Sequence, residues 1–85
     1  MLRLNRMTDY AIVVLGALAH RHGDLLATAQ LAALTGLAQP TVAKVSKILL
    51  AANLVETQRG ARGGYRLAMA PADISLVDIV EAMEG

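Results

Sequence analysis

Residues 28–52, TAQLAALTGLAQPTVAKVSKILLAA, predict two helices joined by a tight turn. Thr28 is a suitable N-cap for a short first helix that runs through Thr35. Gly36 then supplies a residue that tolerates a positive φ angle, as the turn between the two helices requires. Pro40 suits the first turn of the second helix, because that position needs no backbone donor, and Asn53 is a suitable left-handed residue to end that helix after about Ala52.

The apolar residues of both helices recur at helical spacing, so one face of each helix is expected to be buried. The residues predicted to face inward are Leu31, Leu34, Val42, Val45, Leu49 and Ala52. This pattern is typical of a helix-turn-helix, although any two helices joined at a glycine turn share it.

The polar face of the second helix carries side chains that suit contact with DNA. An α-helix fits the major groove, and residues in its N-terminal half most often touch the base edges. Gln39 can pair with adenine, and Lys44 with guanine or a phosphate, whereas Lys47 is equally consistent with an ordinary exposed helix surface. The candidate DNA contacts of this region are Thr28, Gln39, Pro40, Thr41, Lys44 and Lys47.

A β-hairpin is predicted directly after the second helix. Short extended runs at 54–58 and 65–67 flank the Gly-rich connection RGARGG, residues 59–64. Arginines in such a connection can enter a minor groove or hold phosphates, and glycines let the backbone approach closely. The candidate DNA contacts here are Arg59, Gly60, Arg62 and Gly63. A hairpin after a recognition helix indicates a winged helix, although a Gly/Arg tip by itself is often only a solvated turn.

Helices are also predicted at both ends of the chain. Thr8 is a suitable N-cap for a helix over about 9–22, and Ser75 for a last helix over 75–85. Asp78 stands where it completes a capping box with Ser75.

Length and composition limit the chain to one small domain. Its 85 residues are 55% hydrophobic, with two tyrosines as the only aromatic residues, so the core must be aliphatic. We therefore predict one winged helix-turn-helix domain over residues 1–85, mainly α with a small β-hairpin. Its parts are the helix-turn-helix at about 28–52, the wing at about 54–67 and the start of a further helix at 75–85.

The charge of the chain is unevenly distributed, although its net value is only +1. Residues 39–67 hold five basic residues and one acidic residue, for +4, whereas residues 68–85 hold four acidic residues and no basic one, for −4. A basic stretch of this kind is typical of a nucleic-acid contact, and a solvated charged face is the alternative.

Several function classes find no support. The chain has no cysteine, which excludes a disulfide, a cysteine zinc site and a thiol nucleophile within these residues. The longest apolar run, 11–19, is too short to cross a membrane. A metal site formed by His20, His22 and Asp24 is conceivable, but solvated residues at a helix end are far commoner. We predict neither an enzyme nor a small-molecule substrate. Asp9 argues against a signal peptide, so we expect a cytoplasmic protein.

Several segments together form a recognisable family pattern. They are MLRL at 1–4 with TDYA at 8–11, PTV at 40–42, LVE at 54–56, RGARGGYRL at 59–67 and ISLVDIVEAMEG at 74–85. This pattern resembles the bacterial Rrf-two family of winged-helix regulators, which includes IscR, NsrR and the SUF-system Fe–S assembly regulators. The resemblance covers essentially the whole chain, and the SUF-system branch is the most similar.

The resemblance implies a homodimeric DNA-binding repressor or activator that senses Fe–S supply, nitric oxide or redox state through a cluster of 2Fe–2S or 4Fe–4S type. In the family the cluster cysteines lie beyond the point where this chain ends. We therefore expect this chain to be the DNA-binding part of a longer regulator, or a truncated relative. In some members an acidic residue of the first helix is a ligand, and Asp9 occupies the matching position. In the family, wing arginines enter the minor groove, so the resemblance supports Arg59 and Arg62 as DNA contacts.

Together these observations predict a sequence-specific transcriptional regulator of Fe–S cluster assembly or of iron and redox-stress genes. It is expected to bind double-stranded operator DNA as a homodimer, with no cofactor held by this chain alone. The alternative is a winged-helix module for protein–protein interaction without DNA binding, in which the basic hairpin only increases solubility.

Overall fold

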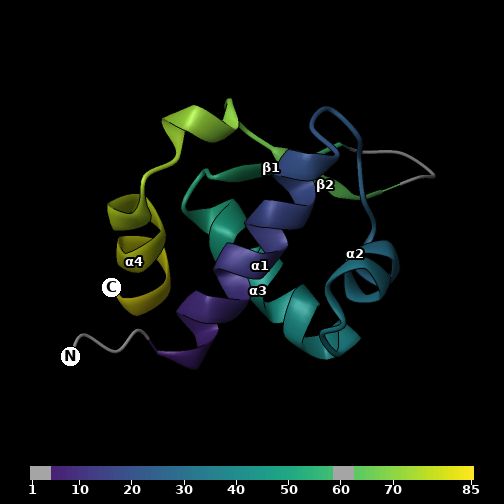
Figure 1. Cartoon of the computed structure of the whole chain (residues 1–85), viewed down its shortest axis with the longest axis horizontal. Coiled ribbons are helices and arrows are strands. Elements are labelled where there is room, and N and C mark those ends of the chain that lie inside the picture. Colours follow the sequence, from purple (N-terminus) through teal and green to yellow (C-terminus); the bar gives the residue numbers. More distant parts are fainter. Residues whose placement is uncertain (1–4, 59–62) are drawn as a thin grey trace.

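The computed structural model describes residues 5–58 and 63–85. Its helices and strands follow in the order α1 (Arg6–His20), α2 (Thr28–Thr35), α3 (Gln39–Ala51), β1 (Val55–Thr57), β2 (Tyr65–Leu67), the short 3₁₀ helix η1 (Pro71–Asp73) and α4 (Leu76–Glu84), as Figure 1 shows. This is the predicted arrangement of helices with one small β-hairpin.

The first helix begins earlier and ends earlier than the sequence pattern predicted. Its N-cap is Asn5, whose Oδ1 accepts a hydrogen bond from the Thr8 amide at 2.8 Å, so the prediction of Thr8 as the cap is wrong. Asparagine is a stronger N-cap than threonine, and the earlier start places Thr8 inside the first turn, fully buried. The helix ends at His20, and the chain then turns through Gly23, which has a φ of 93°.

The second and third helices are joined as the glycine pattern predicted. Gly36 ends α2 with a φ of 76°, and its amide donates to the Ala32 carbonyl at 2.9 Å. Pro40 stands in the first turn of α3, and Asn53 follows that helix with a φ of 62°. The left-handed residues after both helices therefore lie where the sequence predicted them.

Two details of α2 differ from the prediction. Thr28 is the first residue of the helix rather than its cap, because Ala27 takes the cap position and its amide donates to Gln30 Oε1 at 2.9 Å. Leu34 is 51% exposed and does not face inward. It lies beside Val13 in a hollow between α1 and α2 of about 290 Å³.

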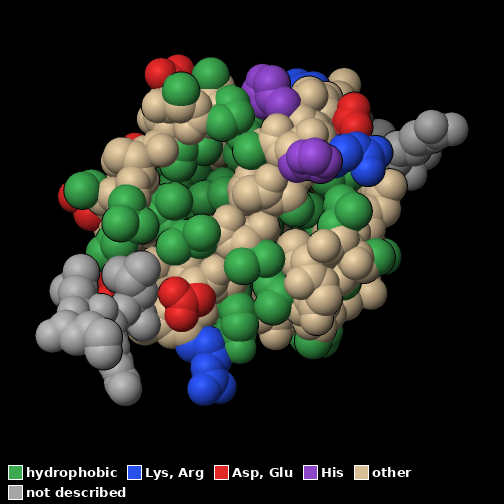
Figure 2. Space-filling model, viewed as in Figure 1, with side chains coloured by type: hydrophobic (Ala, Val, Ile, Leu, Met, Phe, Trp, Pro, Cys, Tyr) green, Lys and Arg blue, Asp and Glu red, His purple; other side chains and the backbone are tan. Residues whose placement is uncertain are grey.

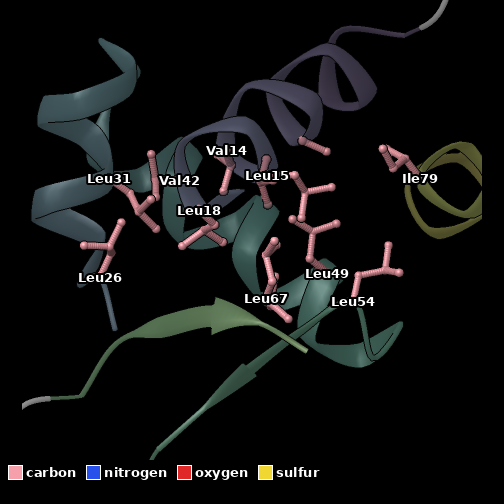
Figure 3. Close-up of a cluster of buried hydrophobic side chains, with 13 residues drawn as sticks. Val14, Leu15, Leu18, Leu26, Leu31, Val42, Leu49, Leu54, Leu67 and Ile79 are labelled. Atoms are coloured by element: carbon pink, nitrogen blue, oxygen red, sulfur yellow. The ribbon is translucent and has the colours of Figure 1, made fainter. Parts of the chain in front are cut away.

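One aliphatic cluster joins the four α-helices and the hairpin. Figure 3 shows side chains from α1, α2, α3 and the hairpin converging on a common centre, with Ile79 of α4 at its edge. The buried residues of this cluster are Ala11, Val14, Leu15, Leu18, Leu26, Leu31, Val42, Val45, Leu49, Leu54, Val55, Leu67 and Ile79. Tyr10 and Tyr65 pack against the cluster and are only partly buried. Because the core is small, each buried leucine contributes a substantial part of the stability of the fold.

The hairpin is short and is joined to a third segment of chain. Strands β1 and β2 pair antiparallel, with Glu56 opposite Arg66 and Val55 opposite Leu67. Leu26, in the loop before α2, forms an additional antiparallel bridge with Tyr65. The Leu26 amide donates to the Tyr65 carbonyl at 2.8 Å, and the Tyr65 amide donates to the Leu26 carbonyl at 2.9 Å. The sequence pattern did not predict this bridge.

The last helix is capped as predicted. Ser75 Oγ accepts from the Asp78 amide at 3.1 Å, and the Ser75 amide donates to Asp78 Oδ2 at 3.0 Å. At the other end of α4, Glu84 Oε2 accepts from the buried Thr8 hydroxyl at 2.8 Å. This hydrogen bond fixes the C-terminal end of α4 against the first turn of α1.

Candidate nucleic-acid interface

The third helix has one buried face and one polar face. Its buried residues are Val42, Val45, Ser46 and Leu49. Lys44 and Lys47 are exposed and stand on the opposite side of the helix, three residues apart, so their ammonium groups project from successive turns. Within residues 5–58 and 63–85 neither lysine belongs to an ion pair, so both charges are available to an anionic partner.

The beginnings of α2 and α3 lie side by side. Gln39 Nε2, at the first position of α3, donates to Thr28 Oγ1, at the first position of α2, at 3.2 Å. The cap residues Ala27 and Ala38 have no side-chain oxygen, so no side chain of the cap itself satisfies the first amides of either helix. Two helix N-termini, each with partial positive charge, therefore meet at this surface.

Because Thr28 does not cap α2, its hydroxyl group is available for contacts outside the helix. Its hydroxyl oxygen accepts from Gln39, and its hydroxyl proton has no acceptor in the described part of the chain, so it can be donated outward. Gln39 is exposed, and its carbonyl oxygen and second amide proton remain available. Pro40 is exposed beside it, and Thr41 is half-buried at the edge of the α3 face. The structure thus brings together the predicted contacts of the two helices.

The wing is attached to the same region through Leu26. The bridge between Leu26 and Tyr65 lies two residues before Thr28, so the base of the hairpin adjoins the start of α2. In Figure 1, α2 and the first turns of α3 lie on the right, toward which β2 also extends, whereas α4 lies on the left. Of the predicted wing contacts, Gly63 is exposed. Arg59, Gly60 and Arg62 lie outside the described residues.

Two other cations are already neutralised by neighbours. Arg66 Nε donates to Glu56 Oε1 at 2.7 Å across the hairpin, and Arg21 Nε donates to Asp24 Oδ2 at 3.0 Å after α1. Both pairs are partly exposed, so they stabilise the fold little. The Arg66 charge nevertheless belongs to the hairpin itself and is less available than those of the α3 lysines.

The described residues do not assemble a metal site. Asp9 is exposed in the first turn of α1, where its charge favours the helix N-terminus. Within residues 5–58 and 63–85, no three His, Cys, Asp or Glu side chains gather where they could hold a metal ion, so His20, His22 and Asp24 do not form the conceivable site. In the same part of the chain, no helix combines the length and apolar character that a membrane span requires.

Two adjacent helices that present a polar recognition face, followed by a hairpin attached at their base, define the winged helix-turn-helix class of domain. Comparison with known proteins identifies the family within this class. The model of the Rrf2 family, described as an iron-dependent transcriptional regulator, matches residues 4–85, and the chain belongs to this family. Its members are transcriptional regulators rather than enzymes, which agrees with the resemblance seen in the sequence.

Curated relatives agree with this assignment. The chain is 37% identical over 84 residues to the HTH-type transcriptional regulator NsrR of Bacillus subtilis (strain 168), covering 98% of this chain and 58% of that protein. It is 34% identical over 83 residues to protein aau3 of Rhizobium meliloti (strain 1021), covering 98% of this chain and 54% of the relative. The chain therefore spans little more than half the length of these relatives.

Solved structures share the whole fold. T. potens IscR superposes with a TM-score of 0.89 at 33% identity, covering 99% of this chain and 62% of the other. CymR, the global cysteine regulator of B. subtilis, superposes with a TM-score of 0.89 at 30% identity, covering all of this chain and 67% of the other. The winged-helix fold predicted from the sequence is thus confirmed.

Proposed function

We propose that this chain binds operator DNA with α3 in the major groove and the wing on the flanking backbone. Two copies would bind as a homodimer, in the cytoplasm, and regulate genes of Fe–S cluster assembly or of iron and redox stress. The observation that carries the proposal is the meeting of three elements at one surface: α3 contacts α2 through Gln39 and Thr28, and the wing joins the loop before α2 through Leu26.

Each helix residue has a role that follows from its chemistry. Gln39 can offer its amide to the N6 and N7 atoms of adenine, and Lys44 can donate to the O6 and N7 atoms of guanine. Thr28 can donate its free hydroxyl proton to a phosphate while it holds Gln39 in place. Thr41 can contact a thymine methyl group or a phosphate, and Lys47 a phosphate.

The wing completes the contact. Arg59 and Arg62 would reach the minor groove or the phosphates, while Gly60 and Gly63 allow the backbone to approach the duplex. These roles rest on the residue types and on the attachment of the hairpin base beside α2.

Exposed aliphatic side chains support the homodimer. Four of them are more than a third exposed: Ile12 and Val13 of α1, and Leu76 and Val77 of α4. A second copy of the chain could bury these side chains. In Figure 2, hydrophobic side chains gather on the face between α4 and α1. Two domains related by a two-fold axis would read an inverted repeat.

The proposal that the target genes belong to iron or Fe–S metabolism rests on the family. Its model is described as iron-dependent, which supports target genes of iron or Fe–S metabolism. The residues of this chain do not by themselves fit a cluster, because the chain has no cysteine and the described part gathers no three possible ligands. Asp9 could supply one oxygen ligand in a longer chain, and no step of DNA binding is assigned to a cluster.

Selection of binding sites from randomised duplex DNA tests the proposal. The wild-type chain is expected to enrich an inverted-repeat consensus, and Gln39→Ala or Lys44→Ala should relax the preference at single base positions by ~1–3 kcal/mol. Arg21→Ala, which removes an exposed charge paired with Asp24, is the matched control and should leave the consensus unchanged.

Two results would count against the proposal. The same consensus for wild type, Gln39→Ala and Lys44→Ala would refute the assignment of base contacts. Failure of the wild-type chain to enrich any sequence, or to shift duplex DNA at low salt, would favour the protein–protein interaction module instead.

A further inference from the structure

We propose that Gly64 is a positioning residue that fixes the wing relative to the helix-turn-helix. Because it has no Cβ, the hairpin backbone can lie directly against Leu26, in the loop that leads into α2. The proposal rests on the proposed function, since it gives the wing a place on the DNA that depends on this contact.

The contact at Gly64 is tighter than nearly all contacts that a residue with a side chain makes. A Cβ placed there would stand 3.0 Å from the Leu26 carbonyl carbon and 3.1 Å from both the Leu26 nitrogen and oxygen. All three are backbone atoms, so no side-chain rotation can relieve the overlap. Gly64 does not adopt a positive φ, so space and not backbone conformation requires the glycine.

Leu26 is held too firmly to move aside. Its side chain is 1% exposed and lies next to Leu31 in the core, as Figure 3 shows. Its backbone makes hydrogen bonds of 2.8 and 2.9 Å with Tyr65, the residue after Gly64. A Cβ at position 64 would therefore push the hairpin away from Leu26 and weaken this bridge.

The displacement would fall on the functional end of the hairpin. On the C-terminal side of Tyr65, toward Leu67, β2 is held in place by its pairing with β1 and by the Arg66–Glu56 ion pair. The chain on the other side of Gly64 leads to Arg62 and Arg59, the proposed wing contacts. Gly64 thus acts on DNA through the placement of these arginines and touches no nucleotide in this proposal.

A thermodynamic cycle tests this role. Gly64→Ala, the Arg59→Ala/Arg62→Ala double variant and the triple variant are compared with wild type for binding to a fluorescein-labelled duplex of the selected consensus, across a series of salt concentrations. Gly64→Ala is expected to weaken binding on the order of tenfold and to lower the slope of log K against log salt by about 2, as the loss of both arginines does. The triple variant should bind no more weakly than the double variant.

Two controls separate positioning from a general loss of structure. Gly63→Ala adds a methyl group with no neighbour within 4 Å, so its thermal unfolding should match wild type, whereas Gly64→Ala should unfold at a lower temperature. Hydrogen exchange on the wild-type chain provides a measurement that needs no variant. The amides of Leu26 and Tyr65 should be protected as strongly as those of core helix residues.

The outcomes are distinct. An unchanged salt slope for Gly64→Ala, or losses that multiply in the triple variant, would overturn the positioning role, because a merely structural defect produces that result. Rapid exchange at Leu26 and Tyr65 would overturn it as well. Absence of DNA binding by the wild-type chain would overturn the proposed function itself, and is recognised without any variant.

Discussion

Replacing Ser46 with alanine is expected to stabilise the domain. Its side chain is 1% exposed in the buried face of α3, and its Oγ has no hydrogen-bond partner among the described residues. A hydroxyl buried in this way costs about 1–3 kcal/mol. Alanine also favours the helix over serine by ~0.5 kcal/mol, while the cavity left by one oxygen atom costs about 0.3 kcal/mol. The variant should therefore gain roughly 1–3 kcal/mol.

Urea and thermal unfolding of Ser46→Ala measure this gain, and Ser75→Ala is the matched control. The control removes the same atom, but Ser75 Oγ caps α4 by accepting from the Asp78 amide, so its loss should cost about 1 kcal/mol. For a domain of this size 1 kcal/mol corresponds to about 4–8 °C in Tm. If Ser46→Ala lowered Tm as Ser75→Ala does, the Ser46 hydroxyl would have to make a stabilising hydrogen bond, and the reasoning would be refuted.

Two further predictions concern α1 and the glycine that ends α2. Thr8→Val keeps the shape of the buried side chain but removes the donor to Glu84, so it should cost about 1–2 kcal/mol, and combining it with Glu84→Gln should cost less than the sum of both. Strict additivity in urea unfolding would show that the two side chains do not interact. Gly16→Ala places a methyl group in open space on α1 and should stabilise by ~0.5–1 kcal/mol, whereas Gly36→Ala, at a φ of 76°, should destabilise by a similar amount or more. A gain for both variants would contradict the assignment of Gly36 to the turn.

Features set by neighbouring residues were predictable from the sequence. Gly36 and Asn53 end their helices in the left-handed conformation, and Ser75 caps α4 with Asp78, all as the local pattern indicated. Each of these depends on contacts within about one helical turn, so residue type and spacing determine it.

Features that depend on distant contacts were not predictable in this way. Asn5 and not Thr8 caps α1, and the buried Thr8 hydroxyl instead donates to Glu84, at the other end of the chain, a contact that no local pattern indicates. Leu34 follows the apolar spacing of its helix, yet it is 51% exposed in the hollow between α1 and α2. The bridge between Leu26 and Tyr65 joins segments far apart in sequence and carries no local signal, although the paired glycines before Tyr65 indicate a close backbone approach.

The net charge of the chain conceals the feature that matters most for a DNA contact. Residues 39–67 carry +4 and residues 68–85 carry −4, so the total of +1 reflects cancellation between two regions. The acidic helix α4 lies on the other side of the molecule from α2 and the start of α3 (Figure 1). For the proposed contact, the separation of the basic and acidic regions matters more than the net charge, because phosphates attract the α3 lysines and repel the acidic residues of α4. The domain would therefore approach DNA in one orientation, and salt should weaken this preference as it weakens binding.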